Sequence, residues 1–278
     1  LLSSQADSFF VAALMSPIAV GAYAFYRRIN EMAEQILPIR QFNSVVHPML
    51  FAVQPEEAAW RLPRYFTFLI NITLCVHLPI LAFFAACHAE LVEAVFGGKF
   101  ASSSALLPLV AGFAVLNCFG EPASLIAQYR ERNAVILLSK IFAMANVVGL
   151  FLLIPRFGIF GAAASTGISI LAKNAFIWWH VREAARWNAG WRALAIGVAL
   201  WCSCIAVAVG IREGLHLGPI SHMAVAAVLC TGAAWVHARG AGLTHSDREL
   251  LKRLLGGAAA RVAMRLRSST ACSAKALI

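Results

Sequence analysis

The residues best able to do chemistry are charged side chains inside a long, partly apolar segment, Val20–Val53. On a helix, the polar residues from Arg27 to Gln35 share one side, and apolar residues such as Phe25 and Ile29 occupy the other. A charge in the middle of a bilayer costs about 2.5–3.5 kcal/mol, so such residues usually face a wet interior and mark a pathway. The polar side holds Arg27, Arg28, Asn30, Glu31, Glu34 and Gln35.

Two lysines in other apolar segments extend this set. Lys140 lies about two turns into Ala134–Ile154, and Lys173 lies beside Asn174, before the end of Gly158–His180. Each lysine alone could snorkel to the membrane surface. Together with the arginines they predict a mainly cationic cavity, which suits an anionic group such as a diphosphate. The candidate cavity residues are Arg27, Arg28, Glu31, Glu34, Lys140, Lys173 and Asn174.

Two carboxylates are candidates for coupling transport to an ion. Asp7 stands at the end of the first apolar fragment, and Glu121 precedes Pro122 inside an apolar segment. No serine-hydrolase elbow, zinc-protease, nucleotide-binding or paired-cysteine motif occurs in the sequence. We therefore expect no enzyme activity, no metal site and no cofactor, and we expect transport to be driven by a gradient or by substrate supply.

Composition decides which elements must position these residues. Hydrophobic residues make up 60% of the 278 residues and charged residues 13%, with a mean hydropathy of +0.75. Soluble domains contain about 45–50% apolar and about 25% charged residues. A single soluble core cannot hide this excess, so the sequence predicts an all-α bundle of transmembrane helices.

The apolar segments predict about eight passes, of which the first is incomplete. A crossing helix needs about 20 mostly apolar residues. The first fragment ends at a break over Met15–Ser16–Pro17. The predicted segments are Leu1–Leu14, Val20–Val53, Tyr65–Cys87, Ala105–Ala127, Ala134–Ile154, Gly158–His180, Trp191–Ile211 and Ile220–Ala238.

The positive charges give the orientation. If the first fragment runs outward, seven Lys and Arg residues fall in inside loops and eight in the tail. The outside loops hold three, Lys99, Arg156 and Arg212. The net charge of +10 is thus mainly a topology signal, and we expect no nucleic-acid partner. In the tail, Ser246 and Glu249 have capping-box spacing, which predicts a basic amphipathic helix on the inner leaflet, with a disordered tail as the alternative.

Several short motifs occur in a familiar order. They are Asp7, Val20–Tyr23, Pro48, Phe96–Gly97 and the string from Ile154 to Ala163, which reads IPRFGIFGAA. This order resembles the second half of Wzx-type polysaccharide flippases, in the multidrug/oligosaccharidyl-lipid/polysaccharide exporter superfamily, and it extends over residues 6–186. The resemblance implies two six-helix lobes around a central cavity that opens alternately to each side.

The resemblance also implies an organisation and a function. Residues 1–186 would form the second lobe, 187–238 two additional helices and 239–278 a basic cytoplasmic tail. The substrate would be an undecaprenyl-diphosphate-linked oligosaccharide, carried from the inner to the outer leaflet of a bacterial inner membrane. The partners would be this substrate, membrane lipids and other polysaccharide-assembly membrane proteins. The missing first lobe implies a fragment of a longer transporter or a need for a second polypeptide.

Three other functions stay open at this point. A lipid II flippase would use a similar cationic cavity. A cation-coupled multidrug antiporter would be expected to have an acidic one. A membrane scaffold in a glycan-assembly complex would need no cavity charges on one common face.

Overall fold

The computed structural model describes residues 9–36, 46–97, 100–186, 191–216, 218–240, 243, 247–249 and 251–252. These residues form helices and connecting turns, and they contain no strand. Among them, five helical stretches are long and apolar enough to cross a membrane: Pro55–Val95, Ala101–Tyr129, Asn133–Val181, Ala195–Leu215 and Pro219–Arg239. The predicted all-α fold of apolar helices is therefore confirmed, and the chain is a multi-pass membrane protein.

The break near the start of the chain lies where the sequence predicts it. A short helix over residues 9–14 stops before Met15 and Ser16, and α2 (Pro17–Ile36) begins at Pro17. Proline fits the first turn of a helix, because its missing N–H group would have no partner there. The Ser16 hydroxyl accepts a hydrogen bond from the Ala19 N–H at 3.4 Å and helps to cap this start.

The segment predicted as one pass, Val20–Val53, is divided. Helix α2 ends at Ile36, and the next described helix covers residues 46–51, while residues 37–45 lie outside the described part. Charged residues from Arg27 onward occupy the second half of α2, and this helix is not among the five apolar stretches. Whether α2 crosses the membrane stays a prediction.

Helix α4 (Pro55–Phe96) is longer at both ends than the predicted pass Tyr65–Cys87. Pro55 opens it, and two glutamates in its first turn match the positive end of the helix dipole. Its backbone is non-helical at Cys87, with φ −126° and ψ 16°, so the helix is kinked there. The last turns of α4 consequently point in a different direction from its apolar body.

The predicted pass Ala105–Ala127 is interrupted near its middle. Helix α5 (Leu106–Leu116) passes into a 3-10 turn, η2 (Asn117–Phe119), and then into α6 (Gly120–Tyr129). A short 3-10 turn, η1 (Ala101–Ser103), precedes α5. The change of helix type places the polar side chain of Asn117 in the middle of an otherwise apolar stretch.

The passes predicted over Ala134–Ile154 and Gly158–His180 form a hairpin. Helix α7 (Asn133–Leu138) leads into α8 (Ile141–Val181), which doubles back at Gly158, where φ is 58° and ψ is −137°. The Ser165 hydroxyl donates to the side-chain oxygen of Asn146 at 2.8 Å, so the two halves run antiparallel. A Cβ on Gly161 would lie 2.3 Å from the Leu153 carbonyl oxygen, so only glycine fits at this contact.

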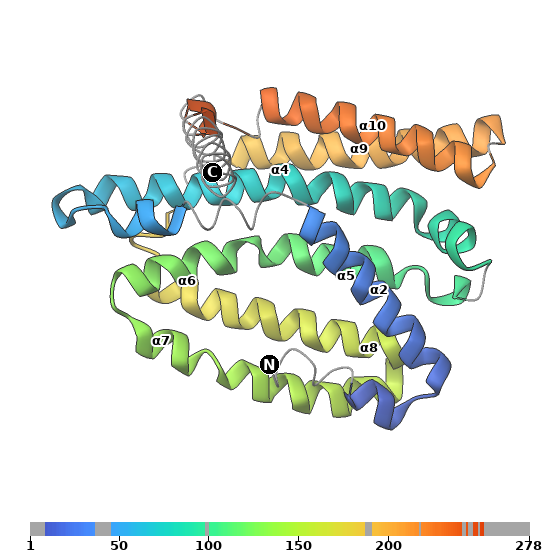
Figure 1. Ribbon diagram of the computed structural model, residues 1–278, viewed down its shortest axis with the longest axis horizontal. Helices are drawn as coiled ribbons and strands as arrows, with labels where there is room; N and C mark the ends of the chain where they lie inside the picture. The colour runs from blue at the N-terminus through green and yellow to red at the C-terminus, as the bar shows by residue number, and fades with distance from the viewer. Residues whose placement is uncertain are drawn as a thin grey trace, which may run out of the picture.

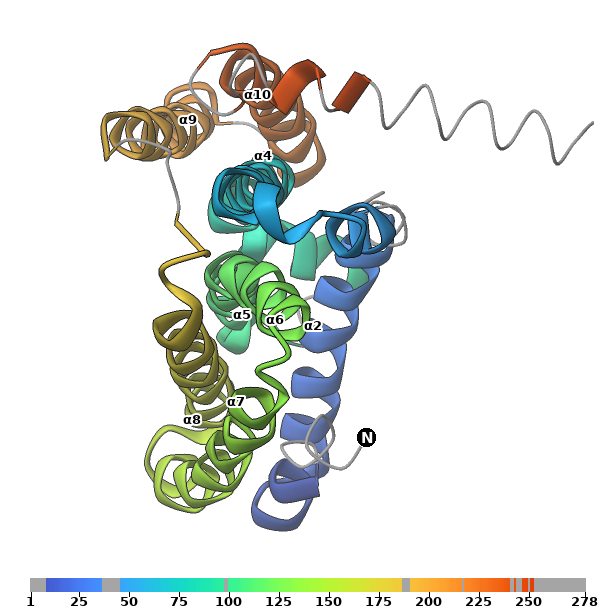
Figure 2. The same cartoon turned by 90° about the vertical axis from the view of Figure 1, so that its left-hand side faces the viewer.

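The helices are stacked in layers, which Figure 2 shows end-on. Helices α9 (Trp191–Leu215) and α10 (Pro219–Arg239) form one layer and pack against α4. Below α4 lie α5 and α6, followed by α7 and the two halves of α8 (Figure 1). Helix α2 stands along one side of this stack and contacts α5. Arg27 and Glu31, in its charged half, line one cavity together with residues of α5 and α8.

Small side chains let α9 and α10 approach α4 closely. Ala82 packs with Cys204 and Cys230, and Ala86 packs with Ala208 and Ala226. Helices in membranes associate through close van der Waals packing, which small residues permit. The cysteines serve here as small apolar residues.

The tail begins on the body of the protein. Asp247 is buried and accepts a hydrogen bond from the Asn71 side-chain amide of α4 at 3.0 Å. Leu251 packs against an apolar cluster that includes Phe68 of α4 and Leu125 of α6. Ser246 and most of the predicted amphipathic helix lie outside the described residues, so that prediction is untested.

Candidate functional site

A cavity of about 410 Å³ collects charged residues from helices far apart in the sequence. Its charged lining residues are Arg27 and Glu31 of α2, Lys140 at the start of α8, and Lys173 near its end. We call this space, defined by these four residues, the cationic cavity. Its described lining holds three cations and one carboxylate, so its charge is net positive. The polar remainder of the wall is Tyr23, Asn117, Ser139, Asn146, Thr166 and Ser169.

On helix α2, Arg27 forms an ion pair with a glutamate of the same helix. Arg27 Nε lies 3.0 Å from Glu31 Oε1, one helical turn away. Arg28 also contacts Glu31, at 3.5 Å, but its side chain is 65% exposed against 28% for Arg27. Glu31 therefore holds Arg27 in one orientation without neutralising the whole cavity. Arg28 is not among the residues that line it.

The α8 hairpin supplies both lysines. Lys140 follows the break between α7 and α8, where the buried Ser139 hydroxyl donates to the Ile136 carbonyl oxygen at 2.7 Å. Lys173 lies on the returning half of α8 and is half-buried. The antiparallel hairpin thus brings two residues that are far apart in sequence to one space, where an anion would meet both of them.

Polar residues that the sequence did not predict lie in or next to the cavity wall: Asn146 and Thr166 line it, and Ser165 bonds to Asn146. Asn146 and Ser165 are buried and hydrogen-bonded across the hairpin, and Thr166 lies within 3.5 Å of the Asn146 amide. A lone asparagine in an apolar segment is a signal that could have identified this position, because a buried amide needs partners. Tyr23 carries no comparable signal, since tyrosine also occurs at membrane interfaces.

A second space adjoins the cationic cavity. It measures about 310 Å³, and three of the predicted residues line it: Glu121, Lys173 and Asn174. Asn117 and Lys173 line both spaces. We call it the amide hollow; its lining comprises His47, Asn117, Gly120, Glu121, Ser124, Leu125, Gln128, Lys173 and Asn174.

Two predicted residues cannot be placed. Asp7 lies outside the described residues, and so does the side chain of Glu34, although Glu34 belongs to the last turns of α2. Of the predicted set, the structure therefore brings Arg27, Glu31, Lys140 and Lys173 into one cavity. Asn174 and Glu121 lie instead in the adjoining amide hollow, and Arg28 is exposed on α2.

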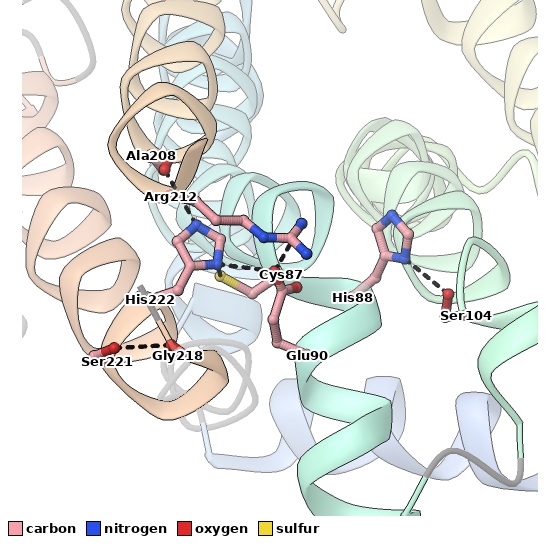
Figure 3. A network of polar contacts seen from close by, with 9 residues as sticks. All are labelled: Cys87, His88, Glu90, Ser104, Ala208, Arg212, Gly218, Ser221 and His222. Carbon is pink, nitrogen blue, oxygen red and sulfur yellow. Dashed lines mark hydrogen bonds and ion pairs between the residues drawn. The ribbon is translucent and has the colours of Figure 1, made fainter. Parts of the chain in front are cut away.

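A separate buried network joins α4 to α9 and α10 (Figure 3). Glu90 Oε1 lies 2.9 Å from Arg212 and 3.0 Å from His222 Nδ1, and Glu90 and His222 are almost fully buried. The other ring nitrogen of His222 is 3.1 Å from the Ala208 carbonyl oxygen. Both ring nitrogens of His222 thus lie within hydrogen-bonding distance of an oxygen atom.

This network was not predicted from the sequence. Arg212 was assigned to an outside loop, and Glu90 follows the end of the predicted pass at Cys87, where a charge is unremarkable. The network lies beside the kink of α4, with the Cys87 sulfur 3.8 Å from His222 Nδ1. It fastens the α9–α10 layer to the kinked end of α4, away from the residues that line the cationic cavity.

Comparison with known proteins gives one match. Residues 1–105 match the family model described as polysaccharide biosynthesis protein. No curated protein and no solved structure matches the chain. The matched region contains α2 and α4, so the arginine–glutamate part of the cationic cavity lies within it, whereas both lysines lie beyond it. Over its first 105 residues, this multi-pass membrane protein is thus similar to polysaccharide biosynthesis proteins.

Proposed function

We propose that the chain carries a lipid-linked oligosaccharide with a diphosphate linkage from the inner to the outer leaflet of a bacterial inner membrane. The observation that carries the proposal is the convergence of Arg27, Lys140 and Lys173 on one cavity. The match of residues 1–105 to polysaccharide biosynthesis proteins supports the same class of substrate. The convergence of the three cations in space is independent of the resemblance in the order of motifs.

The physical problem in this reaction is the charged linkage. A diphosphate cannot enter hydrocarbon without counter-charges, because the desolvation of an ion is far costlier than that of a neutral polar group. Arginine and lysine side chains provide charge-assisted hydrogen bonds to phosphate oxygens. In the proposed mechanism, the diphosphate competes with Glu31 for Arg27 while the two lysines hold its other side.

The composition of the cavity wall favours this proposal over two of the alternatives, the multidrug antiporter and the scaffold. A carrier of cationic drugs would be opposed by the three cations and one carboxylate among the described lining residues. A scaffold would have no reason to gather charges from distant parts of the chain in one cavity. A lipid II flippase would use the same chemistry, so the sugar identity is a separate question from the diphosphate.

Ligand binding tests the role of Lys173. The purified protein in lipid nanodiscs should bind a polyprenyl diphosphate that carries one sugar more tightly than the matching monophosphate. Lys173→Gln should weaken diphosphate binding about tenfold to a hundredfold, the worth of one charge-assisted hydrogen bond. Arg156→Gln is the matched control, because Arg156 is exposed beside the α8 turn and does not line the cavity. Equal binding of both lipids, or equal effects of both variants, would refute the proposal.

A further inference from the structure

The amide hollow differs in chemistry from the cationic cavity beside it. Its lining offers amide groups from Asn117, Gln128 and Asn174, the Ser124 hydroxyl and the His47 ring. Its charged lining residues among those described are Lys173 and Glu121, one of each sign. A space with balanced charge and many donors and acceptors suits a neutral polyhydroxyl ligand better than a phosphate.

Glu121 makes the distinction between the two spaces sharper. A carboxylate accepts hydrogen bonds from hydroxyl groups, but it repels a phosphate oxygen. Among the described lining residues of the cationic cavity, the carboxylate is Glu31, which lies 3.0 Å from Arg27 and 3.5 Å from Arg28. The cationic cavity would thus bind the charged part of one ligand, and the amide hollow would bind its uncharged part.

An amide pair stands where the two spaces meet. The side-chain N–H₂ of Asn174 donates to the side-chain oxygen of Asn117 at 2.6 Å, and Asn174 is 4% exposed. This bond fixes both amides, so that Asn117 presents its remaining polar group to either space. Lys173, the residue before Asn174, also lines both. A ligand that fills the two spaces would therefore pass directly beside Lys173 and Asn117.

Gly120 makes room for this pair. A Cβ at position 120 would lie 2.3 Å from the Asn174 side-chain amide, a distance that real Cβ atoms do not show. Any larger residue must therefore displace Asn174. The Asn174 amide can occupy its observed position because residue 120, at the start of α6, has no side chain.

From these observations we propose that the amide hollow binds the sugar attached directly to the diphosphate while the cationic cavity binds the diphosphate itself. The inference rests on the proposed function, and it adds a site and a ligand class that the charges alone do not give. Asn117, Gln128 and Glu121 would contact the sugar hydroxyls. Asn174 and Gly120 would act as positioning residues. The covalent bond between sugar and phosphate explains why the two spaces share a wall.

The test compares two ligands on the full chain in nanodiscs: a polyprenyl diphosphate with one sugar and the same lipid without it. The wild-type protein should prefer the sugar-bearing lipid about tenfold, which corresponds to one or two net hydrogen bonds. Gln128→Ala should remove most of this preference and leave binding of the sugar-free lipid unchanged. Gly120→Ala should also lower this preference by displacing Asn174, although it removes no group that contacts the sugar.

Gln54→Ala is the matched control, since Gln54 is exposed before α4 and its side chain makes no capping hydrogen bond. This variant should keep the full preference. An undiminished preference in Gln128→Ala and Gly120→Ala would overturn the sugar site, and so would an equal loss for both lipids. Failure of the wild-type protein to bind either lipid would instead refute the proposed function, so the two failures are distinguishable.

Discussion

Replacing Arg27 and Lys140 together by glutamine should reduce lipid-linked sugar transport by a factor of 100 or more, on the order of two lost charge-assisted hydrogen bonds. Both side chains line the cationic cavity, and glutamine keeps their bulk and polarity while removing the charge. The diphosphate would then enter a cavity with Lys173 as its remaining cation among the described lining residues. Surface glycan display, measured in cells that depend on this protein, should fall at unchanged protein level.

Two comparisons make this result specific. Arg156→Gln, which removes an exposed charge beside the α8 turn, should leave display unchanged. Arg28→Gln should have a much smaller effect than Arg27→Gln, because the Arg28 side chain is largely exposed and does not line the cavity. Normal display in the double variant, or equal losses in the two single arginine variants, would contradict the assignment of the cavity.

Glu90→Ala should lower the free energy of unfolding by about 3 kcal/mol, the low end of the range for breaking a buried ion pair. The change leaves the buried His222 ring and the Arg212 guanidinium without their shared acceptor. The low end applies because the Arg212 side chain is 48% exposed and can turn to water. Denaturation of the protein in detergent, followed by helix content, gives the measurement.

Glu93→Ala is the control for this effect. Glu93 lies about one turn further along α4, and its side chain is exposed, so its loss should change stability by a few tenths of a kcal/mol. Glu90→Gln keeps an oxygen acceptor and should fall between the two. If Glu90→Ala is as stable as Glu93→Ala, the network does not fasten α9 and α10 to α4.

The helical elements were largely predictable from the sequence, because hydropathy alone reports which segments are long and apolar. The break at Pro17 and the reversal near Gly158 were also visible as Pro and Gly positions. The close contact at Gly161 was not predictable, since it depends on which backbone atoms the returning half of α8 meets. The kink at Cys87 had no sequence signal of its own, as Pro79 lies two turns earlier.

The candidate site was predictable as a set of residue types but not as a geometry. Charges in apolar segments must find polar surroundings, and this requirement selected Arg27, Lys140 and Lys173. Helical periodicity could not separate Arg27 from Arg28, because both lie on the polar side of α2. Only the packing of α2 beside α5 decides which of the two faces the cavity. Asn174 was grouped with Lys173 by sequence proximity, yet consecutive residues on a helix point about 100° apart.

The Glu90 network shows that a charge counted in a loop for the membrane orientation can still have a buried partner in the folded protein. Arg212 contributes to the count of outside charges, and nothing in its neighbourhood indicates a buried partner. The carboxylate that pairs with Arg212 is that of Glu90 on α4, more than a hundred residues earlier in the chain. Such a pair arises only from the docking of α9 and α10, which the small residues along α4 permit.

The central claim is that Arg27, Lys140 and Lys173 line one water-filled cavity, and thiol labelling tests it most directly. Each residue is replaced in turn by cysteine in a protein whose seven native cysteines are changed to alanine or serine. A charged, membrane-impermeant thiol reagent should label all three positions, and a polyprenyl diphosphate carrying one sugar should protect all three. Labelling of these positions by lipid-soluble reagents alone, with no protection by the lipid, would contradict the account.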